Sequence, residues 1–254
     1  MIRIFKNIKV DLLSKGKTNQ YLKYAIGEIV LVVIGILIAL QINNWNQTRK
    51  DTEALKEYLG KIKSHTLMDI QWLDTLTVYR TEMGRKCKMA RESILDKTEK
   101  QNLPLFMSCG GAFMDYYFKP NTSGYEALKT SKYFGKINNT HLDSLLTTYY
   151  RLVDDIAQTE NSYNDYVNSQ ENYLSTQFDR SLILAYAFLP QDSLKIRATP
   201  QARYYEDFAK YTASPPYRNV IGLAAFQFDA IVYQYGELKK IGREVIKEIN
   251  VITE

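Results

Sequence analysis

Residues 24–45 read YAIGEIVLVVIGILIALQINNW, and the rest of the chain is organised around this stretch. No polar residue occurs from Ile29 to Leu40, and with its apolar neighbours the run reaches the roughly 17 to 20 residues that cross a bilayer as a helix. The stretch predicts one transmembrane helix over residues 24–45. Tyr24 and Trp45 lie at its two ends, where aromatic side chains commonly meet the membrane interface.

The charges beside this stretch predict its orientation. Residues 1–23 carry a net charge of +5, which equals the net charge of the whole 254-residue chain, and the remaining residues hold 27 basic and 27 acidic side chains. Because short basic segments stay on the cytoplasmic side, we expect a cytoplasmic N-terminus and an extracytoplasmic domain over residues 46–254. The expected location is the bacterial inner membrane, with this domain in the periplasm. The balanced charge of that domain gives no indication of nucleic-acid binding.

A cleavable signal peptide also has a basic start and an apolar core. An uncleaved signal anchor fits this chain better, because the basic segment is long and no small-residue cleavage site follows Leu40. Within residues 1–23, apolar residues recur at helical spacing among the basic ones. An amphipathic helix along the inner membrane surface is one interpretation of this segment.

Glu28 is an ionisable residue within the predicted span, and two interpretations stay open. Near the cytoplasmic end, its carboxylate can reach the interface or pair with a lysine; alternatively it faces an oligomer axis or handles protons. Gly35 and Ala39 form a small-xxx-small pair, and Gly27 lies two turns earlier on a similar face. Such a face lets membrane helices approach closely, so these residues are candidate oligomer contacts.

The remaining chain predicts long amphipathic helices without strand-like alternation. A first outer helix is expected to continue the membrane helix to about Lys97, a second to run from Thr140 to near Leu189, and a third to follow Pro216. The third has a seven-residue repeat, which is typical of a coiled coil. The repeat consists of Ala224, Ile231, Leu238, Val245 and Ile252, with Phe228, Tyr235 and Ile249 four residues after the first, second and fourth. The predicted fold class is all-α, an up-and-down extracytoplasmic bundle.

Residues 99–119 interrupt the helical pattern with prolines, glycines and many aromatic residues. They are expected to plug one end of the bundle, and a ligand-binding lid is the alternative. Ser123 and Glu126 then match a capping box at a helix start. The many tyrosines in the apolar stripes predict hydroxyl groups that reach water or a partner, and a carbohydrate- or peptide-binding surface is an alternative.

The inventory of reactive side chains favours a protein without catalytic activity. The two histidines lie on separate segments without metal-ligand spacing, and no phosphate-binding loop or nucleophile motif occurs, so we expect no catalytic residues, cofactor or metal. Cys87 and Cys109 would both lie in an oxidising compartment. They are expected either to form a disulfide, which would contribute about 3 kcal/mol, or to remain buried free thiols.

The block YAIGEIVLVVIGILIALQINNWN, followed by a charged helix and by PNTSGYEALKTS at residues 120–131, resembles a family of uncharacterised single-span bacterial envelope proteins. The resemblance covers the whole chain. It implies a basic cytoplasmic start, one span and a helical extracytoplasmic part, and it supplies no activity. Lys132 stands where the family pattern has Gly, which argues against a tight turn there.

Three functions are consistent with these patterns. The first, which we favour, is a structural or accessory protein in contact with the lipid bilayer that assembles as a homo-oligomer or with other membrane protein subunits. The second is an extracytoplasmic ligand-binding or sensor module. The third is an ion-conducting oligomer that uses Glu28.

Overall fold

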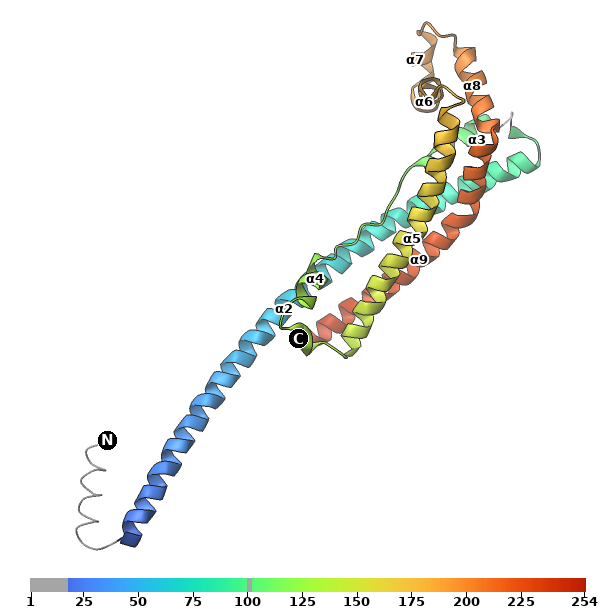
Figure 1. Cartoon of the computed structure of the whole chain (residues 1–254). Helices are drawn as coiled ribbons and strands as arrows, with labels where there is room; N and C mark the ends of the chain where they lie inside the picture. Colours follow the sequence, from blue (N-terminus) through green and yellow to red (C-terminus); the bar gives the residue numbers. More distant parts are fainter. Residues whose placement is uncertain (1–17, 100–101) are drawn as a thin grey trace. The chain divides into compact units, whose positions relative to one another are not determined.

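The computed structural model describes residues 18–99 and 102–254 (Figure 1). The predicted amphipathic helix of the basic N-terminal segment lies largely outside these residues. The chain divides into two compact units, Met1–Glu57 and Tyr58–Glu254. No strand occurs in the described ranges, so the all-α prediction is confirmed for them.

Helix α2 (Thr18–Leu95) contains both the apolar stretch and the first outer helix, as the uninterrupted helical pattern predicted. It ends two residues before the predicted position. Lys97 has a φ of 57°, and such a left-handed residue cannot continue an α-helix. Within the second unit, its buried stripe consists of Leu59, Ile62, Leu73, Leu76, Met83, Cys87 and Ala90.

The second unit is built on three long helices: the Tyr58–Leu95 part of α2, α5 (His141–Ser175) and α9 (Pro215–Thr253). α5 and α9 lie side by side and run in opposite directions (Figure 1). α2 runs antiparallel to α9, because Asp74 pairs with Lys239 and Lys88 pairs with Asp229. α2 and α5 are therefore parallel, so the predicted up-and-down order is wrong for these two helices, and the chain must return along the bundle between them.

That return is made by short elements rather than by a fourth long helix. They are α3 (Leu103–Ser108), the 3-10 turn η2 (Gly110–Phe113), α4 (Ser123–Lys129) and the 3-10 turn η3 (Phe134–Lys136). Residues 114–122, here called the strap, have no regular structure and run along α2 (Figure 1). A segment without helical hydrogen bonds needs other partners for its buried N–H and C=O groups.

The predicted second outer helix is wrong beyond Ser175, because α5 ends there and a separate helix follows. Asp179 starts α6 (Arg180–Phe188) as its N-cap, and its carboxylate accepts a hydrogen bond of 2.9 Å from the Ser181 amide. α7 (Gln191–Lys195) and α8 (Gln201–Ala213) follow. These three helices lie at one end of the α5–α9 pair (Figure 1).

The predicted helix starts have mixed outcomes. Thr140 caps α5 by accepting a hydrogen bond from the Asp143 amide, at the predicted position. The third helix was expected to follow Pro216, but α9 already begins at Pro215, because proline is compatible with the first turn of a helix. The capping box is wrong, because the N-cap of α4 is Thr122 and makes no side-chain cap. The Glu126 carboxylate pairs with Lys129 instead. A turn also forms after Ser131 despite Lys132, through a 3.1 Å bond from the Tyr133 amide to the Ser131 hydroxyl.

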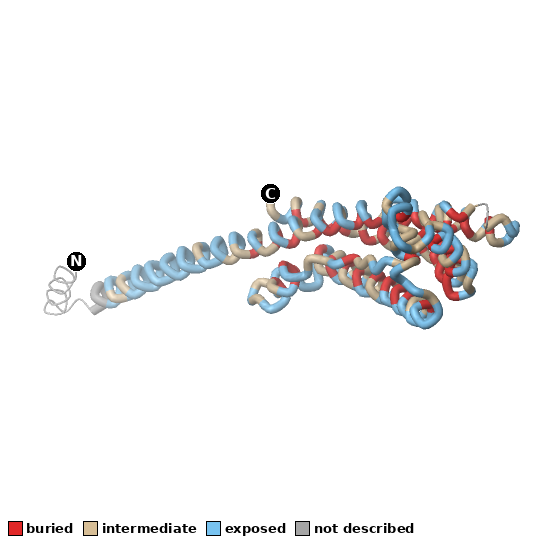
Figure 2. Tube along the Cα trace, turned by 90° about the horizontal axis from the view of Figure 1, so that it is seen from above, coloured by how far each residue is buried: buried red, intermediate tan, exposed pale blue. Residues whose placement is uncertain are grey.

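The seven-residue stripe of α9 supplies much of the core. All its members except Ile252 are buried, and the stripe contacts α2 through Phe228 and α5 through Tyr235. Gly242 allows a close approach here, since a side-chain carbon at this position would lie 3.1 Å from Thr66 and 3.2 Å from Tyr149. The red positions on α2, α5 and α9 in Figure 2 mark the core that the three helices share.

Candidate functional site

The apolar part of α2 is exposed throughout in the described structure. Every side chain from Ile29 to Trp45 is exposed, and pale blue covers this stretch in Figure 2. The helix is long and apolar enough to cross a membrane. Leaving an aliphatic or aromatic side chain in water costs about 1.5 to 3 kcal/mol relative to burial, so a run of this length needs a nonpolar environment.

The predicted contact residues lie on this exposed helix. A side-chain carbon added at Gly27 or Gly35 would meet no atom within 4 Å, and Ala39 is exposed, so this face is open in the single chain. Glu28 is half-exposed. Tyr24 and Trp45 are both exposed, and the Arg49 guanidinium lies 5.8 Å from the centre of the Trp45 ring.

In the second unit, Asp69 of α2 is fully buried and holds the C-terminal end of the strap. Its carboxylate accepts hydrogen bonds of 3.0 and 2.7 Å from the backbone amide and side chain of Asn121. The Tyr149 hydroxyl of α5 donates a third bond of 2.9 Å. The PNTSGYEALKTS motif thus includes a residue with a structural role, because Asn121 joins the strap to α2.

Glu160 of α5 holds the middle of the strap. Its buried carboxylate accepts a 2.8 Å hydrogen bond from the Phe118 amide and a second bond from the Tyr235 hydroxyl of α9. Burial is the main cause that raises the pKa of Glu160, and the hydrogen bonds from Tyr235 and Phe118 and the charge of Arg80 oppose it. This carboxylate therefore connects two long helices and the strap.

Arg80 of α2 is the largest fully buried side chain of the described residues. Its Nη2 donates a 3.0 Å hydrogen bond to the carbonyl of Tyr116 in the strap. Its guanidinium lies 4.6 Å from the ring centre of Phe228 and 5.4 Å from that of Tyr163, where cation–π attraction offsets part of the cost of burying the charge. A second α2 side chain, Trp72, donates to the carbonyl of Tyr117 at 3.4 Å.

Three tyrosine hydroxyls, one from each long helix, hold the segment before the strap. Tyr217 of α9 donates to the carbonyl of Phe106 at 2.7 Å, Tyr79 of α2 to that of Gly111 at 2.7 Å, and Tyr163 of α5 to that of Ala112 at 2.6 Å. These three hydroxyls bond within the chain, so the prediction that tyrosine hydroxyls reach water or a partner is wrong for these three residues.

Cys87 of α2 and Cys109, between α3 and η2, are brought together in this region. Both side chains are fully buried, and both are free thiols in the structure. A hydrogen-bonding interaction with Cys109 is the largest cause that raises the pKa of Cys87, and burial is the second. The same interaction lowers the pKa of Cys109, so the structure brings into one buried region two thiols whose proximity the sequence left open.

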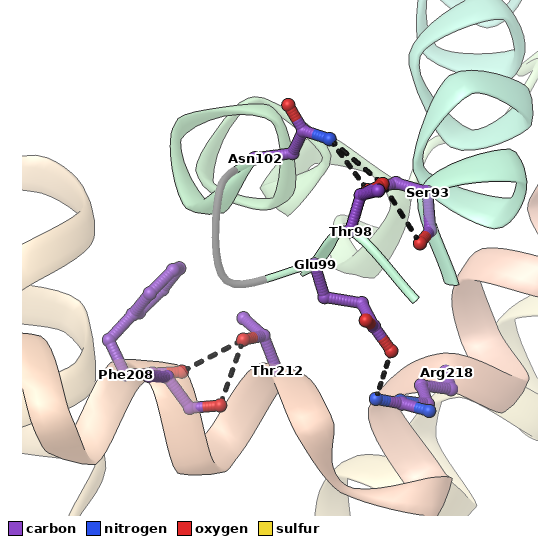
Figure 3. A network of polar contacts seen from close by, with 8 residues as sticks. Ser93, Thr98, Glu99, Asn102, Phe208, Thr212 and Arg218 are labelled. Carbon is purple, nitrogen blue, oxygen red and sulfur yellow. Dashed lines mark hydrogen bonds and ion pairs between the residues drawn. The ribbon is translucent and has the colours of Figure 1, made fainter. Parts of the chain in front are cut away.

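A further set of polar contacts joins the segment after α2 to the end of α2 and to α9 (Figure 3). Asn102 donates to the hydroxyls of Ser93 and Thr98 at 2.8 and 3.2 Å, and Arg218 pairs with Glu99 at 2.8 Å. A cavity of about 560 Å³ lies next to the ion pair. Its lining residues are Glu99, Leu103, Tyr205, Glu206, Ala209, Lys210, Thr212, Ala213 and Arg218.

The buried charged residues were missed by sequence reasoning, although a signal for them exists. Asp69 and Arg80 fall in the same three- and four-residue spacing as the apolar stripe of α2, and Glu160 falls in that of α5. A charged residue in register with an apolar stripe is a candidate for an internal hydrogen-bond network. Within the described ranges, no group of three or more His, Cys, Asp or Glu side chains could hold a metal ion.

A sequence model of one protein family matches residues 28–184, which is more than half of the chain. The chain belongs to the DUF6090 family. DUF6090 is a family of unknown function, and its match extends from Glu28 in the apolar stretch to Leu184 in α6. It therefore includes Asp69, Arg80 and Glu160 together with the strap that they hold. No curated protein and no solved structure matches the chain.

Proposed function

We propose that this chain is a single-span membrane protein of the bacterial cell envelope with a non-enzymatic, structural or accessory role. The observation that carries the proposal is the uninterrupted exposure of the apolar run from Ile29 to Leu40. A lipid bilayer removes the free-energy cost of exposing these apolar side chains to water, and it does so on all sides of a single helix. The helix also satisfies its own backbone hydrogen bonds, as a membrane-crossing segment must.

The orientation follows from the charge of residues 1–23. A net charge of +5 beside the span retains this end in the cytoplasm, so the helical domain lies in the periplasm. The use of the buried ionisable groups supports the accessory role. Asp69, Arg80 and Glu160 bond to the backbone or to side chains of the chain itself, an arrangement that fixes the fold of the domain.

The proposed role includes assembly with a second membrane helix. Gly27, Gly35 and Ala39 leave an open face on the span, where a second helix can approach closely. The partners are the lipid bilayer and either further copies of this chain or other membrane protein subunits.

Fusing reporters to the C-terminus of the full chain tests the orientation. An alkaline phosphatase fusion, active only outside the cytoplasm, is expected to be active, and a green fluorescent protein fusion is expected to be dark. Replacing Lys15, Lys17 and Lys23 by Gln is the matched change, because it weakens the positive flank and should reduce the phosphatase activity. A bright fluorescent fusion with inactive phosphatase would contradict the proposed topology.

A ligand-binding module is the second candidate, and the cavity beside Arg218 favours it. Its volume lies in the range of small-molecule sites, and its lining mixes apolar side chains with a Glu–Arg ion pair. A screen of small carboxylates by thermal unfolding would test this function. A ligand that raises Tm in the native protein but not in Arg218→Gln would support it, and no shift with any compound of the screen would count against it.

A further inference from the structure

One face of α2 lies directly against the segment that contains Cys109. Tyr79, Met83 and Cys87 follow one another at four-residue steps and therefore share this face. Tyr79 donates to the Gly111 carbonyl, and a side-chain carbon at Gly111 would collide with the ends of both Tyr79 and Met83. Cys87 is one turn beyond Met83, and Cys109 is two residues before Gly111.

The backbone around Cys109 is fixed on both sides. Before it, the Phe106 carbonyl accepts a hydrogen bond from Tyr217; after it, the carbonyls of Gly111 and Ala112 accept from Tyr79 and Tyr163. These donors come from three different helices, so the position of Cys109 depends on the completed bundle. The fold therefore places the backbone around Cys109 against the α2 face that carries Cys87, and both thiols are buried there.

Cys87 and Cys109 can form a disulfide within the chain only with each other. The chain contains two cysteines, so an intramolecular partner is unique for each. Both are fully buried, which excludes other thiols once the domain has folded. The interaction between the two thiols raises the pKa of Cys87 and lowers that of Cys109, so Cys109 is the thiol that ionises more readily to react with an oxidant.

We propose that Cys87 and Cys109 form an intrachain disulfide that fastens the α3–η2 segment to α2. Each thiol loses one hydrogen as the bond between the two Sγ atoms forms. The two electrons and two protons pass to a disulfide oxidant, such as oxidised glutathione or a thiol–disulfide oxidoreductase, which is reduced to two thiols. In the cell, the bond rests on the proposed function, since such oxidants act outside the cytoplasm.

The geometric part of the proposal is tested by refolding. The full chain in detergent is reduced, unfolded and refolded with reduced and oxidised glutathione, then quenched with acid and alkylated in denaturant. The expected product carries no alkyl group, and its mass is lower than that of the reduced chain by two hydrogens. Two alkyl groups per chain, or glutathione attached to either cysteine, would overturn the proposal whatever the topology.

Cys87→Ser and Cys109→Ser are the matched controls. Each variant should gain one alkyl group or one glutathione under the same conditions, while its helical content stays that of the native chain. The oxidised native chain should also have a higher urea midpoint than its reduced form, because the bond restricts the unfolded chain. Equal midpoints would overturn the fastening role of the disulfide.

A second experiment, in cells, tests the disulfide and the proposed topology separately. Cells producing the native chain are acid-trapped, and the free thiols are alkylated in denaturant. No labelling, together with bond formation in glutathione, supports both the disulfide and the periplasmic location. Two labels per chain in cells, together with bond formation in glutathione, would leave the bond supported and overturn the proposed periplasmic location.

Discussion

The Tyr149 hydroxyl donates a 2.9 Å hydrogen bond to the carboxylate of Asp69, and both side chains are fully buried. The same carboxylate accepts two bonds from Asn121, so one side chain of α2 joins α5 to the end of the strap. In a low-dielectric interior these bonds depend on one another, because losing their shared acceptor leaves several buried donors without a partner.

Asp69→Ala should lower the free energy of unfolding by about 3 to 5 kcal/mol, because it removes the acceptor of a buried network. Tyr149→Phe removes one donor and should cost about 1 to 2 kcal/mol. Urea unfolding of the full chain in detergent, followed by circular dichroism, measures both. Asp155→Ala is the control, since its exposed pair with Arg151 should contribute less than about 1 kcal/mol. Equal costs for Asp69→Ala and Asp155→Ala would contradict the structural role of Asp69.

The buried carboxyl of Glu160 should make stability depend on pH. Because burial raises its pKa in the folded state, the folded chain holds the proton more tightly than the unfolded chain. The resulting stability is fully present below the ordinary pKa, near 4.5, and is lost as the pH rises through the folded-state pKa. Glu160→Gln cannot ionise, so the free energy of unfolding of the native chain should fall relative to this variant as the pH rises from about 4.5. Urea midpoints across this range measure the difference, and a constant difference would contradict the pKa direction.

Gly111→Ala should destabilise the domain by about 1 to 3 kcal/mol, because the added carbon displaces Tyr79 and Met83 and strains the bond from Tyr79 to the Gly111 carbonyl. Gly135→Ala is the matched control, since a side-chain carbon there would meet no atom within 4 Å. Thermal unfolding of both variants measures the contrast. Equal Tm values for the two variants would show that Tyr79 and Met83 of α2 do not pack closely against Gly111 of η2.

The long helices could be predicted because their signals are local. The cap at Thr140 starts α5, Pro215 starts α9, and the seven-residue stripe from Ala224 is buried as far as Ile249. Each of these features depends on a few neighbouring residues or on one period along the helix. The break after Ser175 was missed because the apolar spacing continues across it, while the decisive cap at Asp179 is a single side chain.

The strap could not be predicted, because its structure depends on distant residues. Asp69, Arg80 and Glu160 each contact a backbone group at least 36 positions away, and no local pattern specifies such pairs. The distance between Cys87 and Cys109 was unknown for the same reason. Aromatic and glycine residues at 99–119 indicated an irregular segment, but the tyrosines that hold it come from all three long helices.

Val33→Lys places a charge near the centre of the proposed span and should reduce membrane insertion, since a central lysine costs about 2.5 to 3.5 kcal/mol. The expected result is a smaller share of the chain in carbonate-washed membranes. Ile34→Leu is the conservative control and should insert like the native chain. If Val33→Lys remained fully membrane-bound after carbonate, the span would have to lie elsewhere.

A bulky side chain on the open face of the span should weaken assembly of the chain in the membrane. Gly35→Leu fills the groove that a neighbouring helix would occupy and should shift the assembled fraction toward single chains, whereas Gly60→Ala on the outer part of α2 should leave it unchanged. Cross-linking in native membranes, read as the fraction of cross-linked chain, measures the change. An unaltered fraction for Gly35→Leu would place the assembly contacts outside this face.

The mass and subunit composition of the complex extracted from membranes in a mild detergent test the proposed accessory role most directly. We predict that the 29.5 kDa chain is recovered in a larger assembly, either with further copies of itself or with other membrane protein subunits. Recovery of single chains alone, under conditions that preserve a known membrane complex from the same cells, would contradict it.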